Sequence, residues 1–280
     1  MDATQGRLAA LRGRRVLAST LTLLAVATTA MAVQTTANRL GDPATTTGWT
    51  LLVSTAGLYL LSLRKKFIRY RLGPVSGWLQ MHTYMGSFAS LVFLMHIGWP
   101  IRGWFESVLA TCFVIVAVSG MLLMYLSRTM PKRLAAIKQD FRLEQIPALQ
   151  VALVQQSHDL AIRSASLGEG ATLAEFYQLR LLPFFLKPRT LLYRMLPTGY
   201  TRRQLLQELT DLQRYLGSQG IQNQQQLISM VQSKDDLDFH FALQTRLRLM
   251  FALHVALTWA LALMIAVHVV LVFRFQGTML

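Results

Sequence analysis

The chain has 280 residues, of which 53% are hydrophobic and 15% are charged, and its formal net charge is +15. The charged fraction is well below the roughly one quarter that is typical of a soluble domain, so we expect a membrane protein. Basic residues cluster beside apolar runs without interleaved aromatic residues, which favours cytoplasmic membrane loops and anionic lipid over nucleic acid. A single cysteine, Cys112, excludes a disulfide framework and a cysteine-ligated iron–sulfur cluster.

Two predicted spans lie near the N-terminus. The first, at about Val16–Val33, follows several arginines, so we expect a cytoplasmic N-terminus. Ala30-Met31-Ala32 resembles a signal-peptidase site, so a cleaved signal is the alternative, but the polar link that follows emerges on the outer side in both cases. The second span, at about Trp49–Leu63, precedes five positive charges in eight residues, Arg64–Arg71, a pattern typical of the cytoplasmic face.

The third span is expected from about Ser76 to Gly98 and the fourth from about Phe105 to Leu126. The short turn between them carries Trp99 and Trp104, as an aromatic belt at the outer membrane surface requires. The fourth span therefore returns the chain to the cytoplasm.

A mixed polar segment separates the fourth and fifth spans. Residues 128–248 hold 16 basic and 10 acidic residues, a net charge of +6, and we expect a helical cytoplasmic insertion here. Its apolar run Leu181–Leu196 is too short and too often interrupted by prolines to span, which indicates an interfacial or re-entrant element. The expected organisation is four spans in 1–127, the insertion in 128–248, and the fifth span, Met250–Phe273, with a short outer tail in 249–280.

Two of the expected spans each carry two histidines fourteen residues apart. These are His82 and His96 in the third span and His254 and His268 in the fifth. Fourteen helical residues turn about 1400°, within roughly 40° of four full turns, and rise about 21 Å. Each helix therefore presents two imidazoles on one face, one toward each side of a bilayer about 30 Å thick. Ionisable residues in hydrocarbon are costly and indicate function.

The third and fifth spans are separated by one return span and so run parallel. His82 then faces His254 near the cytoplasmic side, and His96 faces His268 near the outer side. Imidazoles from opposite helices could bind one haem iron from both sides, whereas layers about 21 Å apart cannot share a metal. Two histidines without a thiolate or carboxylate do not complete a zinc tetrahedron. Structural histidines or another metal are the alternatives.

Residues near the histidines fit a porphyrin. Gly86 lies within about 40° of His82 around the helix and leaves a backbone surface that a flat macrocycle can approach. Arginines at the predicted helix ends could bind the haem propionates, although they also fit topology signals and snorkelling. These arginines are Arg71 and Arg248 on the inner side and Arg102 and Arg274 on the outer side.

This arrangement resembles the di-haem b-type cytochromes, which include the cytochrome b of quinol:cytochrome c oxidoreductases and the ferric-reductase-like domain shared with NADPH oxidases. The expected arrangement, with ligands on the third and fifth spans and a cytoplasmic N-terminus, is more similar to the ferric-reductase-like group. The resemblance covers about five helices and implies His82, His96, His254 and His268 as axial ligands of two haem b groups, with electrons crossing the membrane. The long insertion is not typical of that group. No flavin and nicotinamide domain follows the fifth span, so we do not expect direct NAD(P)H oxidation.

We therefore expect an all-α, five-span bundle of a bacterial-type inner membrane that relays electrons between separate redox proteins on the two faces. We expect it to be an electron-transfer subunit of an oxidoreductase complex in preference to a self-contained enzyme. One alternative is a subunit that oxidises quinol or reduces quinone, although no residue set identifies a quinone pocket. A second alternative is a haem-free membrane scaffold whose polar segment recruits partners.

Overall fold

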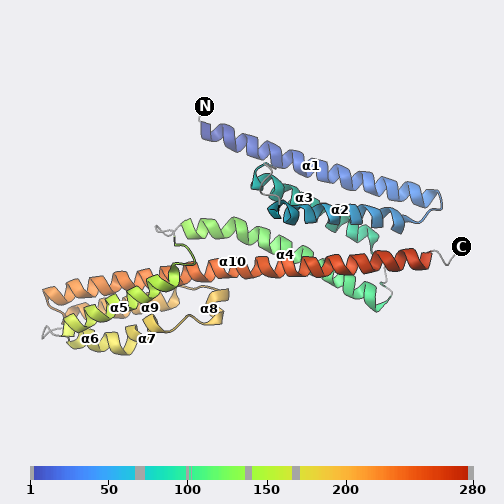
Figure 1. Ribbon diagram of the computed structural model, residues 1–280. Coiled ribbons are helices and arrows are strands. Elements are labelled where there is room, and N and C mark those ends of the chain that lie inside the picture. Colours follow the sequence, from blue (N-terminus) through green and yellow to red (C-terminus); the bar gives the residue numbers. More distant parts are fainter. Residues whose placement is uncertain are drawn as a thin grey trace. The chain divides into compact units, whose positions relative to one another are not determined.

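The computed structural model shows a chain built of helices joined by short links (Figure 1). No strand occurs in the ranges that it describes, so the predicted all-α class is confirmed there. The chain divides into two compact units, Met1–Met124 with His254–Leu280, and Tyr125–Leu253. The described residues are 3–66, 73–98, 101, 103–135, 141–165 and 171–276.

The first unit contains three complete helices and parts of two longer ones. α2 packs along α3, and α1 packs against both (Figure 1). The two longer helices, α4 and α10, each continue into the second unit. Their bounds are α1 (Ala3–Asn38), α2 (Pro43–Lys66), α3 (Val75–His96), α4 (Trp104–Ala135) and α10 (Ser218–Gln276).

Local chemistry explains the turn between α1 and α2. Leu40 adopts a left-handed conformation with φ of 58°, and the amide of Gly41 donates to the carbonyl of Thr36 at 2.9 Å, which closes the end of α1. Asp42 then accepts hydrogen bonds from the Ala44 amide and the Thr45 hydroxyl, both at 2.9 Å. A capping aspartate followed by proline is a strong start signal, and α2 begins at Pro43.

Three described helices contain segments that are long and apolar enough to cross a membrane. These segments are Arg12–Asn38, Trp104–Pro131 and Ser218–Phe275. α2 and α3, which the sequence also predicts to span, are not among them, because threonine, serine, glycine and histidine residues lower their mean hydropathy. The five-span topology therefore stays a prediction. Large apolar side chains are exposed along the first unit, for example Leu24, Leu94 and Leu263, and such a surface is compatible with contact to a membrane or to a protein partner.

The second unit has a core of its own. Along α5, Ile146, Leu153 and Leu160 recur every seven residues, so they share one helical face and enter this core. Leu181 and Phe185, from the run predicted to be interfacial, are buried in the same core. The remaining elements are α6 (Ala171–Phe176), a π-helical turn (Tyr177–Leu181), α7 (Leu182–Leu186), α8 (Leu191–Met195), α9 (Tyr200–Leu212) and a 3-10 turn (Gln213–Tyr215).

A cluster of buried charges ties the elements of the second unit together. Arg189, between α7 and α8, donates from Nε to Asp238 at 2.8 Å and from a terminal nitrogen to Asp235 at 2.6 Å. The Lys234 ammonium contacts Asp238 at 2.5 Å, and the Gln150 amide of α5 donates to the same carboxylate at 2.8 Å. Buried charges are tolerated where each has partners of this kind, so the cluster fixes how α5, α8 and α10 pack.

Replacing Arg189 with methionine should destabilise the second unit strongly. The substitution keeps a long apolar side chain but leaves Asp235 and Asp238 short of a positive partner in a buried site, which typically costs about 3–5 kcal/mol. Thermal unfolding of the purified full chain, followed by circular dichroism, measures the loss.

Arg180→Met is the matched control, because Arg180 pairs at 2.5 Å with Glu208 on the surface. Exposed pairs contribute about 0–1 kcal/mol, so this variant should unfold close to the wild-type temperature. Equal shifts for the two variants would show that the buried cluster does not hold the unit together.

Candidate functional site

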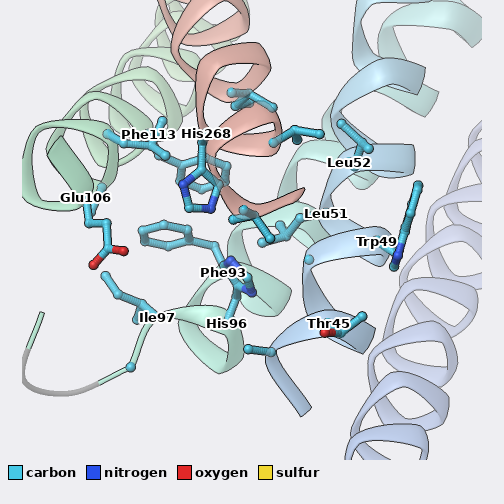
Figure 2. Close-up of a pocket in the computed structure, with 18 of the residues that line it drawn as sticks. Thr45, Trp49, Leu51, Leu52, Phe93, His96, Ile97, Glu106, Phe113 and His268 are labelled. Carbon is cyan, nitrogen blue, oxygen red and sulfur yellow. The ribbon is translucent and has the colours of Figure 1, made fainter. Parts of the chain in front are cut away.

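The predicted outer pair of histidines meets in one pocket of the first unit. The pocket has a volume of about 670 Å³ and is lined by His96 of α3 and His268 of α10, together with residues of α2 and α4 (Figure 2). Pockets of roughly 300–1,000 Å³ are the usual size for small ligands and cofactors. The sequence spacing thus predicts two residues that the structure brings together from distant parts of the chain.

Aromatic and aliphatic side chains form most of the pocket wall. Phe93 stacks on Phe113 with ring centroids 4.2 Å apart, and Figure 2 draws the Phe93 ring between the two imidazoles. Phe105 lies nearly parallel to the His268 ring, with centroids 6.5 Å apart. Asp42 and Glu106 are the acidic residues of the lining. The site is thus an apolar cavity with two imidazoles and little other polar surface.

A hydroxyl from α2 orients His96. The Thr47 hydroxyl lies 2.9 Å from Nδ1 of His96, and 3.0 and 3.1 Å from the carbonyls of Pro43 and Ala44. A hydroxyl has one hydrogen, and a carbonyl can only accept, so Thr47 donates to the backbone and accepts from Nδ1. This network assigns the His96 proton to Nδ1 and leaves a lone pair on Nε2, the state in which histidine binds a metal.

His254 is held in the same way by α4. Its Nδ1 lies 2.8 Å from the Ser119 hydroxyl, which also lies 2.8 Å from the carbonyl of Val116. The same reasoning places the proton on Nδ1 and the lone pair on Nε2. Two histidines on different helices therefore share one hydrogen-bonding arrangement.

A glycine follows each of these hydroxyl residues and lies against the same histidine. A Cβ atom built on Gly48 would come within 3.3 Å of Cε1 of His96, and one on Gly120 within 3.2 Å of Cε1 of His254. Both distances are tighter than ordinary carbon contacts, so each glycine allows the ring to approach the neighbouring helix. We call Thr47-Gly48 and Ser119-Gly120 the hydroxyl–glycine seats. Sequence reasoning missed them, although a hydroxyl–glycine dipeptide in two apolar segments was a visible signal.

The predicted inner pair, His82 and His254, comes within range of an electrostatic interaction in the first unit. Nδ1 of His82 is buried and makes no hydrogen bond to any described residue, with the backbone of Leu58 beside the ring. Nearby, Tyr59 of α2 donates to the carbonyl of Thr258 at 2.8 Å, which ties α2 to α10 one turn beyond His254.

Of the other predicted site residues, Gly86 and Arg248 lie against residues other than the histidines. A Cβ atom on Gly86 would meet Leu58 of α2 at 4.0 Å, so Gly86 lies against a helix. Arg248 pairs with Glu144 in the second unit at 2.6 Å, and this hydrogen bond lowers the pKa of the Glu144 carboxyl. Arg274 is exposed near the end of α10. Arg71 and Arg102 lie outside the described residues.

No group of three or more histidine, cysteine or acidic residues that could hold a metal ion occurs in the described part of the chain. The two histidine pairs are instead suited to a metal that brings most of its own ligands. A haem iron is of this type, because the porphyrin supplies four nitrogens and the protein only the axial ligands. The paired imidazoles, the lone pairs assigned to His96 and His254, and the apolar walls favour a haem, and the Phe93 ring would have to move aside for one iron to bind both His96 and His268.

Comparison with protein families, with curated proteins and with solved structures gave no match to this chain. The resemblance to di-haem b-type cytochromes therefore depends on the histidine spacing and on the geometry described above.

Proposed function

We propose that the chain carries electrons across a membrane through two b haems, each held between one histidine of α3 and one of α10. The observation that carries the proposal is the hydrogen bond at Nδ1 of His96 and of His254. Each ring meets a hydroxyl of a neighbouring helix there, which leaves Nε2 as the nitrogen for a ligand bond, and each interacts electrostatically with a histidine of the other helix. A haem bound there would supply reversible one-electron reduction of its iron.

The residues of the chain hold, orient and enclose the cofactor. The hydroxyl of Thr47 or Ser119 fixes the ring tautomer and raises the basicity of the ligand nitrogen, as outer hydrogen-bond partners of metal-bound histidines do. The apolar wall of the outer pocket excludes water and lowers the local dielectric constant, which tunes a redox potential. Burial of the site in lipid-facing helices would insulate the path from solvent.

We further propose a five-span topology in a bacterial-type inner membrane, with the N-terminus and the second unit in the cytoplasm. Basic residues flank every helix end assigned to that side. The chain would work with separate redox proteins on the two faces, as a subunit of a larger complex. The positive charge of residues 128–248 would favour an acidic protein partner on the cytoplasmic side.

The purified protein should contain close to two haem b groups per chain, measured as the pyridine haemochrome. His82→Ala and His254→Ala should each remove the same haem, and His96→Ala and His268→Ala the other, because each pair shares one site. Redox titration monitored by visible spectra identifies which haem is lost.

His158→Ala is the matched control, because His158 is exposed on α5 in the second unit. It should retain both haems. A colourless wild-type protein would overturn the proposed function and favour a haem-free scaffold. Loss of different haems from the two members of a pair would overturn the pairing.

Thr47→Val and Ser119→Ala should each weaken one haem site. Removing the hydroxyl leaves Nδ1 without its acceptor, and loss of such outer partners typically lowers metal affinity about 10–100-fold. The Nδ1–H would also cease to push electron density toward the iron, so the midpoint potential of the affected haem should rise. Haem loss to apomyoglobin and redox titration measure the two effects.

Thr50→Val and Ser107→Ala are controls for these variants, since both hydroxyls bond only to a backbone carbonyl of their own helix or the turn before it. They should leave both haems at wild-type affinity and potential. Unchanged haems in Thr47→Val and Ser119→Ala, with two haems in the wild type, would show that the seats do not act on the ligands.

Single cysteines in a Cys112→Ser background should report the proposed orientation. A cysteine at Gln155, which is exposed on α5, should react with a membrane-impermeant maleimide only after the membranes are opened. A cysteine at Arg39, exposed after α1, should react in intact spheroplasts. The reverse pattern would invert the topology.

A further inference from the structure

The second unit exposes a group of large apolar side chains at α8 although it buries a substantial core. Three side chains of α8 and one from the residue that follows the helix form this surface, which we call the α8 face. They are Leu191, Leu192, Met195 and Leu196, with exposed fractions of 76%, 73%, 56% and 64%. Leu186, the last residue of α7, is also exposed. An exposed apolar patch of this kind marks an interaction surface.

Helical spacing gathers these side chains on one side. Leu191 and Met195 are four residues apart, as are Leu192 and Leu196, so the two pairs lie next to each other along one edge of α8. Thr190 caps the helix by accepting from the Tyr193 amide at 3.3 Å, and Arg189 before it is fixed by the buried carboxylates. The edge is therefore held in place and is not a loose loop.

Contacts with α10 fix the position of the α8 face along the axis of that helix. Arg246 of α10 donates to the carbonyl of Met195 at 2.9 Å, and the Arg194 guanidinium lies over the Phe241 ring at 5.5 Å. The apolar run of α10 begins at Met250, four residues and about 6 Å beyond Arg246. The α8 face thus lies where α10 changes from polar to apolar, which for a spanning helix is the boundary between water and lipid.

Basic side chains accompany the α8 face. Lys187, four residues before Leu191, is exposed, and Arg194 and Arg246 lie at α8 through the contacts above. Segments that lie in the plane of a membrane surface and bind anionic headgroups typically combine leucine and methionine with lysine and arginine.

We propose that α8 is a membrane-interface helix. The α8 face enters the boundary between headgroups and acyl chains of the same bilayer that the apolar half of α10 crosses, and the neighbouring cations bind lipid phosphates. The occupant of this surface is an anionic lipid leaflet, and not a second protein. The proposal depends on the membrane insertion of α10 but not on the presence of haem.

Spin labels on the full chain test the proposal. The chain, carrying Cys112→Ser and one introduced cysteine, is reconstituted into vesicles of phosphatidylcholine with phosphatidylglycerol. Labels at Leu192→Cys and Leu196→Cys should collide readily with oxygen and poorly with a water-soluble nickel complex. Two reference sites calibrate the depth: Gln155→Cys on α5 for water, and Leu263→Cys, an exposed residue of the apolar half of α10, for lipid.

Labels on α8 that collide with the nickel complex as often as the Gln155 label would overturn the proposal and leave the face to a protein partner. An aqueous signal at Leu263 would also overturn it, by showing that α10 does not enter the bilayer. In vesicles of phosphatidylcholine alone the α8 labels should lie nearer to water. An unchanged depth would show that the cations do not bind lipid phosphate. Haem content, measured on the same samples, reports separately on the proposed electron-transfer function.

Discussion

An imidazole placed among apolar helices must find partners for its ring nitrogens, since burying an unpaired polar group costs free energy. This constraint is met at two histidines of the first unit, whereas the buried Nδ1 of His82 has no hydrogen bond to any described residue. His96 and His254 each satisfy one nitrogen with a hydroxyl from a neighbouring helix, and that hydroxyl is in turn satisfied by the backbone. Because this hydrogen bond at Nδ1 fixes the orientation of the ring, it also fixes the direction in which Nε2 points. The packing of α2 on α3, and of α4 beside α10, is therefore coupled to the chemical state of the histidines.

The sequence predicts the parts of this arrangement that depend on periodicity. Fourteen residues between histidines is close to a whole number of helical turns, so the grouping of His82 with His254 and of His96 with His268 follows from spacing and chain direction alone. The hydroxyl partners could not be found that way. Thr47 is 49 residues from His96, and Ser119 is 135 residues from His254, so only the packed fold brings them together.

The neighbours of single predicted site residues differ from those that the sequence suggests. Gly86 shares a helical face with His82 by angle, yet the helix that covers this position is α2. The place of Arg248 at a helix end suggests a haem propionate as its partner, whereas in the structure it pairs with Glu144 in the second unit. In both cases the sequence specifies which way a residue points from its own helix, and not which neighbour occupies that direction. The buried ion cluster around Arg189 escapes sequence analysis for the same reason, because Arg189 is 46 residues from Asp235 and 49 residues from Asp238.

The glycines of the hydroxyl–glycine seats set two requirements against each other. Glycine inside a helix is less stable than alanine by about 1 kcal/mol, so α2 and α4 are weakened where they meet a histidine. A methyl group at Gly48 or Gly120 would strengthen the helix and press on the ring at the same time. Selection for a more rigid bundle and selection for a closely held imidazole therefore act in opposite directions at these two positions. A thermostable relative would have to gain its stability elsewhere in the bundle.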